Sequence, residues 1–245
     1  NNVAVGKDAG LSITTAQGNS ILGTLAGDAL TTGGDNVAVG YKALTATTTG
    51  TGNTAVGKDA LEANTTASNN TAIGFKTLES NTTGTDNTAV GENAGASVTT
   101  GINNTLIGAE SGDAITDADH NTAVGFRSLS TNVLGSRSIA IGAGALFAQN
   151  PASAADMYNV GIGYEAGVAL TTGVENTLIG GLAGDSLTTS SGNVAIGYQA
   201  LSTALAANTT GGNNTALGTG ALLTNTTASS NTGIGKDALY YNTTG

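Results

Sequence analysis

Residues 53–69 read NTAVGKDALEANTTASN, and this 17-residue unit recurs with small changes along the whole chain. Positions within a copy are numbered from its first residue, an Asn, which stands four residues ahead of a Gly. The 245 residues hold 14 copies; Ser138 replaces the Asn in one of them, and the Gly is never replaced. A fixed short period predicts a stacked array rather than a globular domain.

Positions 2 to 4 alternate β-branched residues with a small one, as in TAV or VAI, which predicts a short strand. The pattern favours β-branched side chains in the core and the small residue on the opposite face. A copy has room for two short strands and two turns, and is too short for helical repeats. The predicted fold is therefore all-β, a parallel β-solenoid or β-roll of about 14 coils forming one continuous array over residues 1–245.

The Asn and Gly columns are the expected structural ladder of the stack. Equivalent residues in successive coils lie ~4.8 Å apart, so side-chain amides can hydrogen-bond from coil to coil. The alternative is that the Asn only accepts a left-handed turn. An invariant Gly indicates a positive φ or backbones too close for a Cβ. The central members of the two columns are Asn19, Asn36, Asn53, Asn70, Asn87, Asn104 and Asn121, with Gly23, Gly40, Gly57, Gly74, Gly91, Gly108 and Gly125.

Position 9 is Leu in some copies and Gly in the others, and every Gly copy carries an aliphatic residue at position 12. This predicts one apolar slot per coil, filled by Leu61 in one copy and by Ile115 in another. The Gly copies come in pairs, and the second of each pair has a large residue at position 3. Block duplication with packing explains this arrangement; a periodic swelling of a binding surface is the alternative.

The small third positions are predicted to form a smooth outward stripe that lets a second chain approach closely. The bulky third positions would fill gaps in that interface. The expected interface residues are Ala38, Ala55, Ala72, Ala89, Ala123 and Ala140, together with Ile21, Leu106 and Leu178.

Two copies, residues 138–158 and 193–213, carry four extra residues each. Extra residues in a solenoid coil make a surface bulge, which is a common place for binding, although loops also lengthen at little cost. The first insertion suggests a binding loop made of Gln149, Asn150, Pro151, Met157 and Tyr158.

Composition and motifs argue against catalysis and against several partners. The net charge of −10 without a basic cluster disfavours nucleic acid and anionic membranes, and no apolar run approaches the ~20 residues that span a bilayer. The single histidine, His120, lies near Asp117 and Asp119, which fits a solvated turn better than a metal site. No cofactor motif or catalytic triad can be assembled. The sequence therefore predicts a non-enzyme without cofactor or metal.

The strand motif, seen as NNVAVG at 1–6, SIAIG at 138–142 and NVAIG at 193–197, resembles the head repeat of trimeric autotransporter adhesins of the YadA type. The resemblance implies a left-handed parallel β-roll, association of three chains and an adhesive role. The coil is longer than the family's usual one, and Thr often replaces the first Val. The fuller pattern at 70–86 is also similar to repeats of bacteriophage tail fibres and large bacterial surface proteins.

The expected function is structural and adhesive: a stiff stalk or head in an extracellular surface fibre, on a cell or a virion, acting as a homotrimer or filament with an unidentified receptor or glycan. Both ends lie in repeat register, which suggests a segment of a longer fibre. The alternatives are a bacteriophage tail-fibre shaft and an ice-binding β-solenoid. The ice-binding alternative would use the threonine row Thr14, Thr31, Thr48, Thr65, Thr82 and Thr99.

Overall fold

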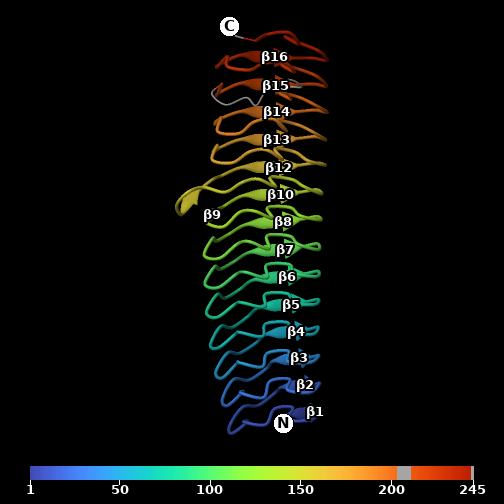
Figure 1. The fold of residues 1–245 in the computed structure, drawn as a ribbon, viewed down its shortest axis with the longest axis vertical. Coiled ribbons are helices and arrows are strands. Elements are labelled where there is room, and N and C mark those ends of the chain that lie inside the picture. Colours follow the sequence, from blue (N-terminus) through green and yellow to red (C-terminus); the bar gives the residue numbers. More distant parts are fainter. Residues whose placement is uncertain (203–210, 244–245) are drawn as a thin grey trace. The chain divides into compact units, whose positions relative to one another are not determined.

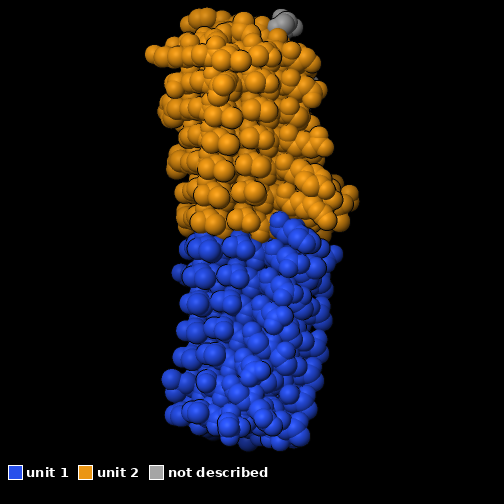
Figure 2. Space-filling model, turned by 180° about the vertical axis from the view of Figure 1, so that it is seen from behind, with its two compact units in different colours: residues 1–120 blue, residues 121–245 orange. Residues whose placement is uncertain are grey.

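The computed structural model describes residues 1–202 and 211–243. The chain is an all-β parallel β-solenoid of about 13 turns with a repeat of ~17 residues, and the described residues contain no helix. It divides into two compact units, residues 1–120 (unit 1) and 121–245 (unit 2), coloured separately in Figure 2. The division falls at the start of a repeat copy, and both units are built from the same coil.

Unit 1 contributes one three-residue strand per coil (Figure 1). Neighbouring strands pair in parallel without a shift, so that equivalent positions align: Thr54 with Thr71, and Ala55 with Ala72. The strands are β1 (Val3–Val5), β2 (Ser20–Leu22), β3 (Val37–Val39), β4 (Thr54–Val56), β5 (Thr71–Ile73), β6 (Thr88–Val90) and β7 (Thr105–Ile107).

Unit 2 repeats this arrangement and adds a small second sheet. Two-residue strands β9 (Gly135–Ser136) and β11 (Ala155–Asp156) pair in parallel at the outer edge of the coils, apart from the column of main strands (Figure 1). The main strands are β8 (Thr122–Val124), β10 (Ile139–Ile141), β12 (Val160–Ile162), β13 (Thr177–Ile179), β14 (Val194–Ile196), β15 (Thr215–Leu217) and β16 (Thr232–Ile234).

Each ordinary coil holds one strand, so the prediction of two strands per coil is wrong. Positions 5, 7, 9 and 17 have positive φ; in one coil these are Gly57, Asp59, Leu61 and Asn69. Such closely spaced left-handed residues keep turning the chain, and a second extended segment cannot form. Backbone hydrogen bonds still join the turns, as where Leu61 N donates to Thr77 O over 3.1 Å.

The glycine at position 5 is required for both predicted reasons. Gly74 has a φ of +140°, and a Cβ added there would lie 2.6 Å from the carbonyl oxygen of Gly91 in the next coil. A side chain at this position would therefore meet both backbone strain and a steric clash.

The asparagine ladder is confirmed. Asn36 Oδ1 accepts two hydrogen bonds from Asn53 in the next coil, from the backbone N at 2.9 Å and from Nδ2 at 3.1 Å. Asn53 Nδ2 also donates to Ala67 O at 2.9 Å, which ties the start of a coil to its end. The Asn is buried and lacks a positive φ, so its amide hydrogen bonds explain the column and the turn alternative is wrong.

The ladder also determines which residues face inward. The amide at position 1 points into the coil, and strand alternation then places position 3 on the same side. The expected interface is therefore wrong, because all of its members lie in the core. The alanines Ala38, Ala55, Ala72, Ala89, Ala123 and Ala140 are at most 1% exposed, and Ile21, Leu106 and Leu178 are at most 2% exposed.

Position 9 of one coil packs against position 3 of the next. A Cβ added at Gly161 would lie 2.7 Å from Leu146 Cγ, so a Leu at position 9 requires a small residue at the following position 3. Conversely, a large residue at position 3, such as Leu106, requires glycine at position 9. Leu106 Cδ1 lies 2.7 Å from a Cβ added at Gly95, and its Cδ2 lies 2.8 Å from one added at Gly112.

One large residue at position 3 therefore needs two glycines at position 9, in its own coil and in the preceding one. Leu178 between Gly167 and Gly184 repeats the arrangement. The paired glycine copies are thus a packing device, and the proposed surface swelling is wrong. The shared slot is confirmed. Leu61 and Ile115 are both fully buried, and a Cβ added at Gly112, at position 9, would lie 2.9 Å from Ile115 Cδ1.

Replacing Leu106 by Ala should leave a cavity between Gly95 and Gly112, since neither glycine has a side chain to fill it. We expect the free energy of unfolding to fall by about 2–5 kcal/mol. Chemical denaturation of the variant and the parent measures the difference. Leu11→Ala is the matched control, because Leu11 is 71% exposed and should change stability by less than about 0.5 kcal/mol. Equal losses in the two variants would contradict the packing rule.

Candidate functional site

The outward strand face consists of positions 2 and 4, because positions 1 and 3 point inward. In unit 1 it is an uncharged surface on which Ile73 and Ile107 are 40% and 39% exposed. Its central columns are Thr54, Thr71, Thr88 and Thr105 beside Val56, Ile73, Val90 and Ile107. We call this surface the strand face.

The threonines at position 13, expected as an ice-binding row, are engaged within the stack. Thr48 Oγ1 donates to Thr65 O at 3.2 Å, and Thr65 Oγ1 donates to Thr82 O at 3.1 Å. The same bond is made by Thr14, Thr31, Thr82 and Thr99. Hydroxyls that join one coil to the next are poorly suited to ordering water, which weighs against this row.

Exposed aromatic rings occupy position 6 in five coils, a column that the sequence reasoning missed. Within each unit successive rings are two coils apart, whereas Glu92 and Ala109 occupy position 6 of the two coils between Phe75 and Phe126. Tyr41 and Phe75 belong to unit 1, and Phe126, Tyr164 and Tyr198 to unit 2. The residues between successive rings differ. Lys58 separates Tyr41 from Phe75, Ala143 separates Phe126 from Tyr164, and Gly181 separates Tyr164 from Tyr198.

A groove of about 310 Å³ opens beside Phe126 and Tyr164, near the lower limit of volumes that hold small ligands. Its lining is Phe126, Phe147, Tyr164, Ala143, Gly144 and Val168, with Arg127 and Glu165 as the charged members. The Arg127 guanidinium carbon lies 5.1 Å from the Phe126 ring centroid. The hydrogen bond with Glu165, and the charge of that carboxylate, raise the pKa of Tyr164.

In unit 1 lysines lie over the equivalent rings. Lys58 Nζ and Lys76 Nζ are 5.4 and 5.8 Å from the Phe75 ring centroid. Lys42 Nζ is 5.8 Å from the ring of Tyr41. These distances are within the range of cation–π attraction. The chain's own ammonium groups therefore already cover the unit 1 rings.

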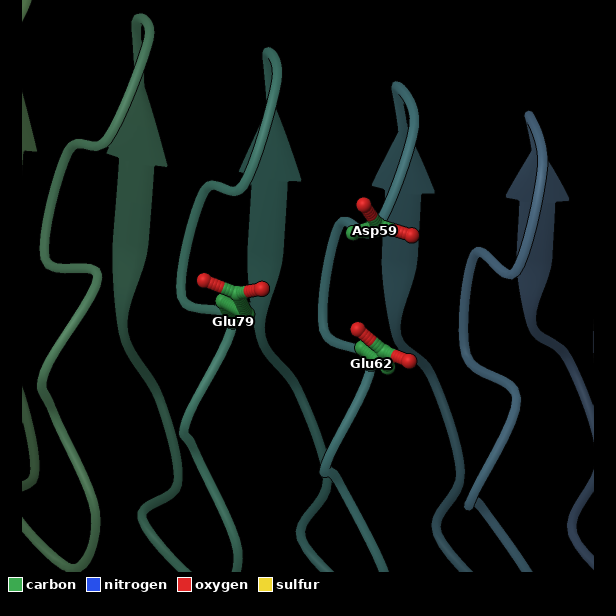
Figure 3. A group of neighbouring side chains, drawn as sticks. All are labelled: Asp59, Glu62 and Glu79. Atoms are coloured by element: carbon green, nitrogen blue, oxygen red, sulfur yellow. The ribbon is translucent and has the colours of Figure 1, made fainter.

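An acidic cluster lies beside these lysines. Asp59 and Glu62 come from one coil and Glu79 from the next (Figure 3), with carboxylate oxygens within 4.8 Å of one another. Carboxylate oxygens can bind Ca²⁺ or Mg²⁺. Each carboxylate is already paired, however: Lys42 Nζ lies 2.8 Å from Glu62 Oε1, Lys58 Nζ 3.5 Å from Asp59 Oδ2, and Lys76 Nζ 2.9 Å from Glu79 Oε1.

Hydrogen bonding to Glu62 and the charge of that carboxylate hold the pKa of Lys42 above its ordinary value, and Glu79 has the same effect on the pKa of Lys76. Raised lysine pKa values mean that the pairs stabilise the fold fully below the ordinary lysine pKa. This stabilisation is lost as the pH rises through the raised values. Three lysines balance three carboxylates, so the cluster is a neutral ion-pair network that needs no cation.

The expected binding loop is wrong for three of its five residues. Gln149, Pro151 and Met157 are buried, and only Asn150 and Tyr158 are exposed. The pairing of β9 with β11 turns part of the insertion back onto the coil. Met157 then packs at Gly135, where an added Cβ would lie 2.9 Å from its Cγ.

Gln149 repairs the ladder at the one copy without its Asn. Ser138 has no amide, and Gln149 Oε1 accepts hydrogen bonds from Ser138 Oγ at 3.1 Å and from Asn159 Nδ2 at 3.0 Å. In ordinary coils the Nδ2 at position 1 instead donates to the Asn Oδ1 of the preceding coil, as Asn176 Nδ2 does to Asn159 Oδ1 at 3.1 Å. Gln149 is therefore a structural residue in the core.

The remaining candidates offer no constellation. His120 is exposed at the end of its coil, where Asp119 Oδ1 accepts a hydrogen bond from Ile102 N at 2.7 Å and Asp117 accepts one from Thr100. In the second insertion, residues 203–210 lie outside the described residues. Across the described ranges, no helical segment has the length and apolarity to cross a bilayer.

Comparisons with known proteins were negative. No protein-family model, no curated protein and no solved structure matches the chain. The resemblance to adhesin heads and tail fibres therefore stays a hypothesis drawn from the repeat motif.

The repair by Gln149 can be tested with a double-mutant cycle. Gln149→Thr should lower the free energy of unfolding by about 1–3 kcal/mol, because the buried Asn159 amide loses one of its two acceptors and keeps only Gly173 O. Ser138→Asn with Gln149→Thr recreates the pairing of Asn36 with Thr47 in an ordinary coil, and should recover most of the loss. Urea denaturation of the parent, both single variants and the double variant measures the coupling. Simple addition of the two single effects would contradict the repair.

Proposed function

We propose that this chain is a non-catalytic structural and adhesive segment of an extracellular surface fibre. The proposal rests on the coil-to-coil ladder, in which a buried amide joins neighbouring coils through two hydrogen bonds and closes its own coil through a third. Such a stack resists local opening because each coil is held on both sides. The one acidic cluster found among the described residues is neutralised by lysines, which supports a role without metal chemistry.

The working form that we propose is a homo-oligomer, a trimer of left-handed rolls by resemblance to adhesin heads. The strand face is the surface that a second copy would cover, in place of the buried alanines. It is uncharged and regular, with threonines beside aliphatic residues, whereas lone soluble rods tend to carry charge on such strands. A bacteriophage tail-fibre shaft would need the same rod and the same association.

Charge on the strand face should prevent association. Ile73→Lys with Val90→Lys adds two cations to adjacent coils of the face, and we expect the molar mass measured by light scattering to fall to that of one chain. Thr66→Lys with Thr83→Lys is the matched control, because these exposed residues lie in a turn of neighbouring coils. The control should keep the mass of the assembly.

A parent chain that is monomeric at all concentrations would overturn the homo-oligomer. A strand-face variant that retains its parent's multimeric mass would instead show that the copies meet elsewhere. Thermal unfolding of each variant separates dissociation from loss of the fold.

Ice binding is the second candidate, and the strand face favours it more than the expected threonine row does. Successive coils place Thr71, Thr88 and Thr105 in register beside aliphatic residues, so that hydroxyl and methyl groups recur at the coil spacing of ~4.8 Å. Thermal hysteresis of the parent chain, abolished by Ile73→Lys with Val90→Lys, would support this function. Its absence would exclude it.

A further inference from the structure

We propose that the groove between Phe126 and Tyr164 receives an alkylammonium group, the side chain of a lysine on a basic partner protein. The inference rests on the proposed adhesive function, since it names the chemistry of the partner that the surface would hold. The groove lies on position 6 of the coils and does not include the strand face.

In unit 1 a lysine of the chain itself occupies position 6 between two coils that carry aromatic rings. Tyr41, Lys58 and Phe75 stand at position 6 of three successive coils, and the Lys58 ammonium lies 5.4 Å from the Phe75 ring centroid. The lysine thus belongs to the coil between the two rings, and its ammonium reaches the ring of Phe75. Its carboxylate neighbour is Asp59, at 3.5 Å.

Unit 2 has the same rings without the lysine. Phe126, Ala143 and Tyr164 occupy position 6 of three successive coils, and β8, β10 and β12 pair in register despite the extra residues of the inserted coil. A methyl group replaces the lysine side chain, and the groove opens at that place. Phe126 and Tyr164 are 52% and 60% exposed, compared with 43% and 40% for Tyr41 and Phe75.

The lining of the groove suits a cation with an alkyl stem. Ring faces attract cations, and Phe126, Phe147 and Tyr164 all border the space. Arg127 already lies over the Phe126 ring. The ammonium group of a partner lysine would therefore bind on the Tyr164 side of the groove, next to the Glu165 carboxylate. The net charge of −10 would draw a basic partner toward the chain.

By the same reasoning we expect a second opening at Gly181. Gly181 lies between Tyr164 and Tyr198, and a Cβ added at Gly181 would lie 3.5 Å from Tyr198 Cδ2, in ordinary contact. The two openings are two coils apart, roughly 10 Å, which is the distance between every third residue of an extended peptide. An exposed cation–π contact is weak, so a partner would gain affinity by occupying both.

The experiment uses the full chain and a fluorescent peptide of four Lys-Ser-Ser repeats, with binding followed by anisotropy at physiological salt. Ala143→Lys copies the lysine of unit 1 and should weaken binding about 2- to 5-fold by filling one opening. Tyr164→Leu removes the ring shared by both openings and should weaken binding more. Ala152→Lys adds the same charge at an exposed residue outside the groove lining and should leave binding near the parent value.

The ligand chemistry is tested with modified peptides. A trimethyl-lysine version should bind at least as well as the lysine version, because cation–π attraction persists when hydrogen-bond donors are lost. An acetyl-lysine version should not bind. Any of three results would overturn the proposal. Ala143→Lys and Ala152→Lys could weaken binding equally, the acetyl-lysine peptide could bind, or a neutral glucan oligosaccharide could bind in the groove in place of the lysine peptide. The molar mass of the strand-face variant tests the fibre role independently of peptide binding. A failure of the proposed function can therefore be distinguished from a failure of the lysine-binding proposal.

Discussion

The inward-pointing amide at position 1 is the interaction on which the rest of the structure depends. It accepts two hydrogen bonds from the following coil and donates one across its own coil, so it sets both the stacking register and the closure of the coil. Buried amides without partners are costly, and every neighbouring coil must therefore keep the same register. Ser138 shows how strict this requirement is, because Gln149 supplies the missing acceptor from another position of the coil.

The direction of that amide decides the roles of the remaining positions. Position 3 shares its side of the strand and must fit a thin core, which explains the alanines there. Leu106 is tolerated only because Gly95 and Gly112 leave its space open. The β-branched residues at positions 2 and 4 are turned outward and make the strand face. The same constraint that stabilises each coil thus creates the uncharged surface that association would cover.

The period, the ladder and the shared core slot could be predicted from the sequence, because each is a correlation between columns of the repeat. Which face lies inside could not, since alternation alone does not say whether Ala72 or Ile73 is buried. Residue preference pointed to Ile73, and the polar Asn at position 1 outweighed it. Met157 was misplaced for a related reason. Counting extra residues locates an insertion, but it does not reveal the pairing of β9 with β11, after which Met157 lies in the core.

The aromatic column went unnoticed because each copy was compared with a consensus, and a ring present in five of 14 copies disappears from a consensus. In a solenoid the inward columns are held constant by packing, whereas outward columns can vary from coil to coil without cost to the fold. A regular pattern of differences in an outward column therefore carries information on the chemistry of the surface. Lys58, Ala143 and Gly181 occupy the same outward position between rings, and they differ in whether the space between the rings is filled or left open. A binding function in this chain is best sought in such differences between coils, because the core alone explains every feature that the coils share.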